Sequence, residues 1–276
     1  KLQWIYDHQD EILAPEIEFI KNTGVDLIFG DIPPLVTQLA KAAGIPCWMM
    51  SNFGWDYIYR PWGGEFELIA DWIAVCFGDC DRMFRLPFHD PMTAFSNITD
   101  VGLTGGTPKL SADALKDRYN LTTPDEKTVL LTFGGLGLAQ IPYEQALKNY
   151  SDWQFITFDR QAPELPNLLK IEDRMLRPVD MMMVCDRVVS KPGYSTFSEA
   201  CRLECGIVTL TREGFAEAQL LLDGIQRHAY HQILDDVAFF RGDWSFLEKP
   251  LNAPTGEKLD KNGNDAIAAA ITNYFA

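Results

Sequence analysis

Residues 187–200 read Arg-Val-Val-Ser-Lys-Pro-Gly-Tyr-Ser-Thr-Phe-Ser-Glu-Ala, and this stretch decides the fold class. Its first four residues form a short run around two valines, which predicts a buried strand. A turn with proline and glycine follows, and a helical pattern begins at Ser195. A strand that turns directly into a helix is typical of βαβ units, so the stretch predicts a parallel sheet.

The same alternation of strand and helix continues on both sides of this stretch. In the second half of the chain we expect strands at residues 128–133, 154–158, 168–171, 187–190 and 206–210, and helices at residues 111–119, 142–149, 179–185, 195–203, 216–227 and 266–275. In the first half we expect strands at residues 25–29, 46–50, 73–77 and 97–103, helices at residues 11–22 and 34–43, and a loop plus helix at residues 55–72. The pattern predicts an α/β protein with two Rossmann-like, doubly wound parallel-sheet domains.

The run Gly105-Gly106-Thr107-Pro108 interrupts the alternation, so we place a linker between Leu103 and Ser111. The expected domains are residues 1–104 and 111–276, with the final helix packing back on the N-terminal domain. The chain begins Lys1-Leu2-Gln3-Trp4 without a methionine. We therefore expect the N-terminal domain to be truncated at its start.

Composition excludes several classes of partner. The 276 residues carry 24 lysines and arginines against 39 aspartates and glutamates, a formal net charge of -15. A surface this acidic repels nucleic acid and anionic lipid, so no nucleic-acid partner is expected. No apolar run reaches the roughly 18 residues of a membrane span, so no transmembrane segment is expected. The six cysteines are interpreted as small buried residues in a reducing compartment, and we expect a cytoplasmic location.

Ligands of open parallel sheets bind at the loops that leave the carboxyl ends of strands, and three such loops stand out. The first, residues 133–137, reads Phe-Gly-Gly-Leu-Gly, where glycines let the backbone approach a phosphate. A plain tight turn is the alternative.

In the second loop, Ser195 and Thr196 bring hydroxyl and N–H groups together at the start of a helix, which is an anion site. Glu199 follows on the face of Ser195, where its carboxylate suits a ribose diol. A capping box is the alternative.

The third loop, residues 211–219, reads Thr-Arg-Glu-Gly-Phe-Ala-Glu-Ala-Gln. Glu217 and Gln219 flank the start of the next helix and could accept hydrogen bonds from sugar hydroxyls. A solvated helix face is the alternative interpretation for each.

Together the three loops resemble the donor half of GT-B glycosyltransferases, especially the MurG-like group. In that group a Gly-Gly turn precedes a Ser-x-x-Gly-x-x-Thr-x-Ser-Glu helix start and then an acidic or glutamine loop. The corresponding residues here are Gly134 and Gly135, then Ser190, Gly193, Thr196, Ser198 and Glu199, then residues 213–219. The fuller string SKPGYSTFSEA is most similar to the glycosyltransferase-like module of plant arabinokinases and to bacterial stand-alone relatives.

The resemblance implies a role for each matching residue. Glu199 would hold the ribose, and Gly134 and Gly135 would line the phosphate site. Backbone near Leu176 would read the base edge, while Glu217 and Gln219 would meet the donor sugar. The diphosphate would meet the helix start at Gly193, Tyr194, Ser195 and Thr196. Enzymes of this fold generally need no metal, so no cofactor and no metal site are expected.

Residues for the acceptor side are less defined. Relatives usually open with a glycine-rich, His-containing loop that often supplies the catalytic base, and this chain shows no such segment. His89 is the candidate catalytic participant, with an ordinary loop histidine as the alternative. Asn52, Trp55 and Asp56 follow a strand, where a ring can stack on a sugar and polar groups can bind hydroxyls. A buried aromatic cluster is the alternative.

We therefore expect a glycosyltransferase that moves a sugar from a nucleotide-diphosphate donor, with UDP as the expected nucleotide, to a hydroxyl acceptor. Two alternatives stay open: a sugar-nucleotide epimerase or hydrolase of the same fold, and a non-catalytic sugar-nucleotide-binding or regulatory module. The only partner expected is the nucleotide-sugar small molecule. The sequence leaves the donor sugar, the acceptor and the oligomeric state open. It also leaves open the catalytic base, which we expect in the missing N-terminal segment, and whether the protein is catalytically active.

Overall fold

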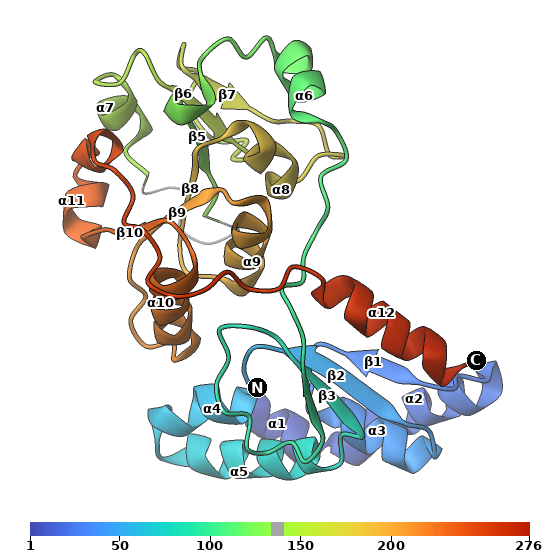
Figure 1. The fold of residues 1–276 in the computed structure, drawn as a ribbon. Coiled ribbons are helices and arrows are strands. Elements are labelled where there is room, and N and C mark those ends of the chain that lie inside the picture. The colour runs from blue at the N-terminus through green and yellow to red at the C-terminus, as the bar shows by residue number, and fades with distance from the viewer. Residues whose placement is uncertain (134–140) are drawn as a thin grey trace. The chain divides into compact units, whose positions relative to one another are not determined.

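The computed structural model describes residues 1–133 and 141–276. Packing within these residues divides the chain into two units. Unit 1 comprises Lys1–Gly102, Phe215–Leu220 and Asn262–Ala276, and unit 2 comprises Leu103–Gly214 and Leu221–Lys261. Each unit contains its own parallel sheet with helices on it (Figure 1). The predicted α/β class with two parallel sheets is thus confirmed.

Unit 1 is built on a four-stranded sheet in the order β1-β2-β3-β4, and every neighbouring pair is parallel. Its strands are β1 (Ile28–Gly30), β2 (Cys47–Ser51), β3 (Arg82–Arg85) and β4 (Ile98–Asp100). Its helices are α1 (Leu2–Asp7), α2 (Gln9–Thr23), α3 (Leu35–Ala43), α4 (Trp55–Tyr59), the 3-10 turn η1 (Arg60–Trp62), α5 (Glu65–Gly78) and α12 (Gly263–Tyr274). Side chains such as Met49, Phe77 and Met83 are fully buried in its apolar core.

Two glycines end helices of unit 1. Gly24 caps α2 at φ 69° and Gly44 caps α3 at φ 76°, both in the left-handed conformation. A residue with a side chain adopts this conformation only at a cost in free energy, so glycine is favoured there.

The strand predicted at residues 73–77 is wrong, because these residues belong to α5. Ile73, Cys76 and Phe77 are buried at helical spacing, and a short apolar run cannot by itself distinguish a strand from a buried helix. The strand that does form is β3, which was not predicted. The strand has an arginine at each end, so its two buried central residues, a methionine and a phenylalanine, are too few to form a recognisable strand pattern.

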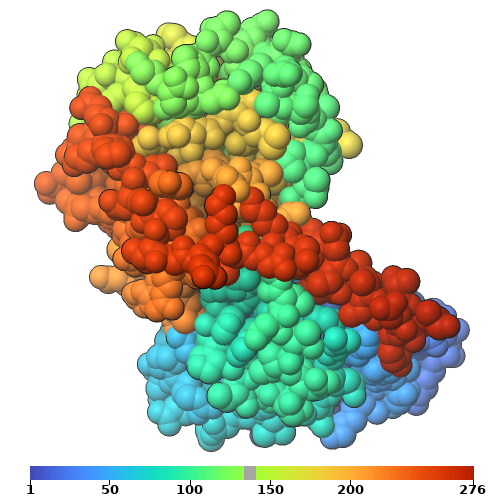
Figure 2. All heavy atoms as spheres, in the orientation of Figure 1, coloured from blue at the N-terminus to red at the C-terminus, as the bar shows by residue number. Residues whose placement is uncertain are grey.

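The last helix belongs to unit 1. Tyr274 of α12 packs edge-on against Trp48 of β2, with ring centroids 5.1 Å apart. In the space-filling view the red C-terminal residues lie against the blue and cyan residues of this unit (Figure 2). Through such contacts the last residues of the chain pack against residues from its first hundred.

Unit 2 is built on a six-stranded sheet in the order β10-β9-β8-β5-β6-β7, again parallel throughout. Its strands are β5 (Thr128–Leu131), β6 (Gln154–Thr157), β7 (Leu168–Lys170), β8 (Arg187–Ser190), β9 (Gly206–Thr209) and β10 (His231–Ile233). Its helices are α6 (Ala112–Tyr119), α7 (Tyr143–Leu147), α8 (Pro178–Met181), α9 (Tyr194–Leu203) and α11 (Asp236–Phe240), with 3-10 turns η2 (Asp125–Lys127), η4 (Met182–Val184) and η5 (Ser245–Glu248). Helix α10 (Glu217–His228) begins in unit 1 and ends in unit 2.

The strand order of unit 2 places a switch point between β5 and β8. From β5 the chain adds β6 and β7 on one side, and it then returns to add β8, β9 and β10 on the other side. Connections leave β5 and β8 in opposite directions. In open parallel sheets, ligands bind beyond the carboxyl ends of the strands at such a switch point. The loop after β5 begins at Thr132, and the loop after β8 contains Lys191 and Gly193.

No helix in residues 1–133 or 141–276 has both the length and the apolar character that crossing a membrane requires.

Candidate functional site

The start of α9 lies at this switch point. Gly193 is the N-cap residue, the helix begins at Tyr194, and its first internal hydrogen bond runs from Phe197 N to Gly193 O over 3.1 Å. Because the N-cap is a glycine without a side-chain cap, Ser195 and Thr196 do not occupy the N-cap position, and the capping-box alternative is wrong. The N–H groups of the first turn precede the internal hydrogen bonds of the helix and carry about half a positive charge between them. The helix start therefore favours an anion.

Two cations lie at the carboxyl ends of β8 and β9. Lys191 is half-buried after β8, and Arg212 follows β9. Burial lowers the pKa of the Lys191 ammonium, and repulsion by the Arg212 guanidinium lowers it further. Two cations at one edge of the sheet can attract an anion to this part of a chain whose net charge is -15. Arg212 was not singled out in the sequence.

The carboxyl end of β5 lies at the same edge of the sheet, next to β8. Thr132 N donates to Val189 O at 2.9 Å, so the chain leaving β5 runs directly beside β8. The predicted phosphate-site residues Gly134 and Gly135 lie outside the described residues.

Leu176 lies in the loop that follows β7, two strands away from β5. Its side chain is buried and its N–H donates to Asp173 O at 3.2 Å. Lys109 Nζ donates to the neighbouring Met175 O at 2.7 Å. The loop is thus held in place, while its contact with a base remains a prediction.

Glu199 is half-buried on α9, one turn after the helix start. Its Oε1 accepts a hydrogen bond from Gly106 N at 2.7 Å. No hydrogen bond to its Oε2 is found within the described parts of the chain. One oxygen of this carboxylate is therefore fixed by the backbone, and the other is open to a hydroxyl donor.

Glu217, predicted to meet the donor sugar, belongs to unit 1. It is the first residue of α10, it is 6% exposed, and its Oε1 accepts from Asn52 Nδ2 at 3.1 Å. A solvated helix face is therefore wrong for Glu217, whereas Gln219 is exposed. The bond joins Glu217 to Asn52, a residue predicted for the acceptor side, although 165 positions separate them.

Asp56 and Trp55 also lie beyond the carboxyl end of β2. Burial raises the pKa of the Asp56 carboxyl, and the nearby Asp90 carboxylate adds to this. Trp55 is half-buried, edge-on to Phe53 at 5.2 Å and stacked on Tyr59 at 5.5 Å between ring centroids. The aromatic cluster of the alternative interpretation is therefore present, and part of the Trp55 ring remains accessible.

Asp90 was not singled out in the sequence. Its buried carboxylate accepts from Gly54 N at 2.8 Å and from Met92 N, and burial raises its pKa. It ties the loop after β3 to the loop after β2. Its position beside His89 was the one sequence signal that could have identified it.

His89 is half-buried in the loop after β3, and its Nδ1 lies 2.8 Å from Asp90 O. A carbonyl oxygen can only accept, so Nδ1 carries the proton and Nε2 is the basic nitrogen of the neutral ring. The preceding Phe88 has a φ of 61°, a strained value for a bulky residue. Such strain clusters at functional sites, which fits a histidine held in one orientation.

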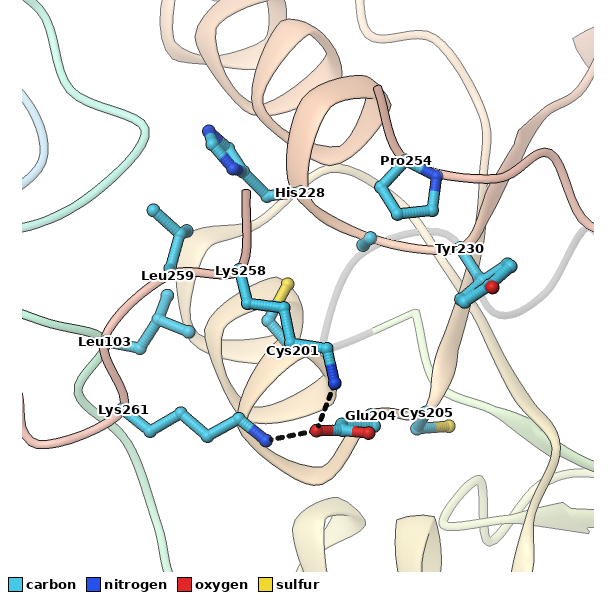
Figure 3. A pocket seen from close by; sticks show the side chains of 11 residues that line it. Leu103, Cys201, Glu204, Cys205, His228, Tyr230, Pro254, Lys258, Leu259 and Lys261 are labelled. Carbon is cyan, nitrogen blue, oxygen red and sulfur yellow. Dashed lines mark hydrogen bonds and ion pairs between the residues drawn. The ribbon is translucent and has the colours of Figure 1, made fainter. Parts of the chain in front are cut away.

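A separate hollow lies at the other end of α9 (Figure 3). It encloses about 140 Å³ among the last residues of α9 and α10, and at its rim Glu204 pairs with Lys258 at 3.0 Å and Lys261 at 2.8 Å. Two helices end here, and their carbonyl ends carry partial negative charge. An anion is therefore better accommodated at the opposite end of α9.

Within residues 1–133 and 141–276, no three His, Cys, Asp or Glu side chains are grouped so that they could hold a metal ion.

No family model matches this sequence. Among curated proteins, an L-arabinokinase from Arabidopsis thaliana is 27% identical over 273 residues. The match covers 96% of this chain and 26% of the relative, so the chain spans about a quarter of that protein's length.

Two solved structures illustrate the likeness in fold. UGT89C1 from Arabidopsis thaliana, in complex with UDP, has a TM-score of 0.59 at 15% identity, covering 89% of this chain and 68% of that chain. A protein assigned as a UDP-N-acetylglucosamine 2-epimerase from Listeria monocytogenes has a TM-score of 0.57 at 14% identity, covering 96% and 79%. The chain has the GT-B fold, as predicted, whereas the MurG-like grouping stays a prediction.

Proposed function

We propose, from the GT-B fold and the start of α9, that this protein binds a UDP-sugar and transfers the sugar to a hydroxyl acceptor without a metal ion. The observation that carries the proposal is the start of α9 at the switch point, where the N-cap residue is Gly193. Lys191 lies just before it in the chain, and Arg212 is near enough to Lys191 to lower its pKa. A nucleoside diphosphate brings at least about two negative charges, which the helix start and two cations can offset.

Unit 2 would hold the nucleotide. Glu199 would accept from the ribose, the backbone near Leu176 would meet the base, and Gly134 and Gly135 would line the phosphate site. The diphosphate would bind the first turn of α9 at Gly193, Tyr194, Ser195 and Thr196. Because negative charge grows on the diphosphate as it leaves, these donors would stabilise the transition state more than the ground state.

Unit 1 would contribute the chemistry of transfer. The acceptor hydroxyl attacks the anomeric carbon, its proton passes to Nε2 of His89, and the bond from that carbon to the diphosphate oxygen breaks. Glu217, oriented by Asn52, and Gln219 would hold the donor sugar. Asn52, Trp55 and Asp56 would receive the acceptor.

Replacement of Glu199 by alanine is expected to weaken UDP binding by about 1.5–3 kcal/mol, the range for a hydrogen bond to a charged group. Isothermal titration calorimetry with UDP measures this change. Glu204→Ala is the matched control, because it removes an exposed carboxylate from the end of the same helix. Unchanged UDP affinity in a folded Glu199 variant would remove Glu199 from the ribose role.

UDP affinity is expected to be the same with and without excess EDTA. Metal-dependent transferases offset the diphosphate with a cation held by closely spaced carboxylates. Here the start of α9 and two cationic side chains are proposed to take that part. The check is a pair of UDP titrations, with a magnesium titration of the EDTA-treated protein as the control. A large loss on chelation that magnesium restores would show that a metal site exists.

A sugar-nucleotide epimerase or hydrolase is the second candidate, and the likeness to the Listeria protein favours it over a binding-only module. Such an enzyme needs no acceptor. Incubation with a labelled UDP-sugar in acceptor-free buffer distinguishes the candidates: an epimerised or free sugar supports the second, and an intact donor supports transfer. An intact donor that is also unchanged with every acceptor offered would favour the binding module.

A further inference from the structure

Residues 104–109, which the sequence marks only as a break, lie bound along α9 and α8. Ser198 Oγ donates to Thr104 O at 2.6 Å, and Gly106 N donates to Glu199 Oε1 at 2.7 Å. Further along, Arg177 Nη2 donates to Thr107 O at 3.2 Å and Lys109 N donates to Asp180 Oδ1 at 2.5 Å. The segment is therefore part of the packed structure of unit 2.

Arg202 completes this arrangement. Its Nη1 donates to Gly105 O at 2.9 Å and to Gly106 O at 2.8 Å. Gly105 O and Gly106 N belong to one peptide group, so that group accepts from Arg202 on one side and donates to Glu199 on the other. A charged donor on the carbonyl polarises the peptide and strengthens its N–H as a donor. The peptide thus links Arg202 to Glu199.

Only glycine fits at the two positions of this peptide. A Cβ on Gly105, which has a φ of 147°, would lie 2.7 Å from Glu199 Cγ. A Cβ on Gly106 would lie 2.8 Å from Glu199 Oε1 and 3.0 Å from both terminal nitrogens of Arg177. Real Cβ atoms essentially never come closer than about 3.0 Å, so any other residue would displace the carboxylate.

We propose that Gly106 and Arg202 are positioning residues for Glu199 and set a preference for ribose over deoxyribose. The Gly106 N–H fixes one carboxylate oxygen, and the other is presented to the 2′-hydroxyl. A carboxylate that is already oriented loses less side-chain freedom when it binds a hydroxyl. This inference rests on the proposed function, because it assigns the ribose to Glu199.

The test compares UDP with 2′-deoxy-UDP by calorimetry, since the two ligands share base and diphosphate. We expect the wild-type protein to bind UDP about 10- to 100-fold more tightly than 2′-deoxy-UDP, because the deoxy ligand lacks one hydrogen bond to a charged group. Gly106→Ala, Arg202→Met and Glu199→Ala should each lower this ratio at least about 5-fold, mainly by weakening UDP. Arg202→Lys should retain part of the ratio, and Glu204→Ala should retain all of it.

Gly106→Ala is suited to this test because the atoms it meets are ends of flexible side chains, so the carboxylate shifts while the fold is kept. In the double variant with Glu199→Ala, the Gly106 substitution should have no further effect on the ratio. A wild-type ratio in folded Gly106→Ala and Arg202→Met, with a collapsed ratio in Glu199→Ala, would overturn this inference alone. Absence of UDP binding by the wild-type protein would overturn the proposed function and this inference with it.

Discussion

Replacement of His89 by glutamine is expected to lower kcat by about 10²- to 10⁴-fold, the usual contribution of a general base. Glutamine is close in size and its amide can still donate to Asp90 O, so the loop after β3 should keep its conformation. It has no nitrogen that can take a proton, so deprotonation of the acceptor hydroxyl fails. The measurement is the rate of UDP release from a UDP-sugar with an acceptor that supports wild-type turnover.

His228→Gln is the matched control for this prediction. The Nδ1 of His228 lies 2.6 Å from Glu257 O, so the same substitution replaces a histidine in a similar backbone contact. It belongs to unit 2 at the end of α10, whereas the loops proposed to act in transfer belong to unit 1. UDP affinity should be unchanged in both variants. A His89→Gln enzyme with kcat within about 2-fold of wild type would assign the base to another residue.

The local sequence pattern was sufficient to predict most helices and strands near the candidate site. Residues 187–200 have a strand, a glycine turn and a helix start in immediate succession, and β8, Gly193 and α9 follow that order. The prediction failed where the apolar residues of an element have no spacing that distinguishes a strand from a helix. Residues 73–77 are apolar in both a strand and a buried helix, and β3 carries charged residues at both ends.

Long-range hydrogen bonds at the candidate site could not be predicted from sequence. Glu199 was interpreted as a ribose ligand or as part of a capping box, and neither interpretation includes its partner Gly106, which lies 93 positions earlier. Glu217 was interpreted as a sugar ligand, with a solvated helix face as the alternative, yet it is buried and accepts a hydrogen bond from Asn52. Such contacts depend on which loops the sheet brings to one edge, and neither propensity nor periodicity encodes that. The Gly-Gly run at 105–106 was a signal, but it was interpreted as linker chemistry rather than close approach to a side chain.

Loss of both cations at the switch point is expected to have the largest effect on binding. The double variant Lys191→Ala with Arg212→Ala should weaken UDP binding at least about 100-fold, because two hydrogen bonds from charged groups to the diphosphate are lost. The effects of the single variants should not add up, because Lys191 and Arg212 repel each other and would contact the same diphosphate. Calorimetry at fixed ionic strength measures the change. The control is Lys148→Ala with Arg227→Ala, which removes the same charge from exposed positions of unit 2.

The pH dependence of UDP binding gives a second measurement of the same cations. Lys191 is charged below its pKa, which burial and Arg212 hold below the ordinary lysine value. Because the diphosphate favours the charged form, UDP affinity should be constant near neutral pH and fall as pH rises through this lowered pKa. In Arg212→Ala the repulsion is absent, so the pKa of Lys191 rises and the fall should begin at a higher pH. If the fall begins at the same pH in both proteins, Lys191 and Arg212 do not share an anion, and the diphosphate would have to be assigned elsewhere.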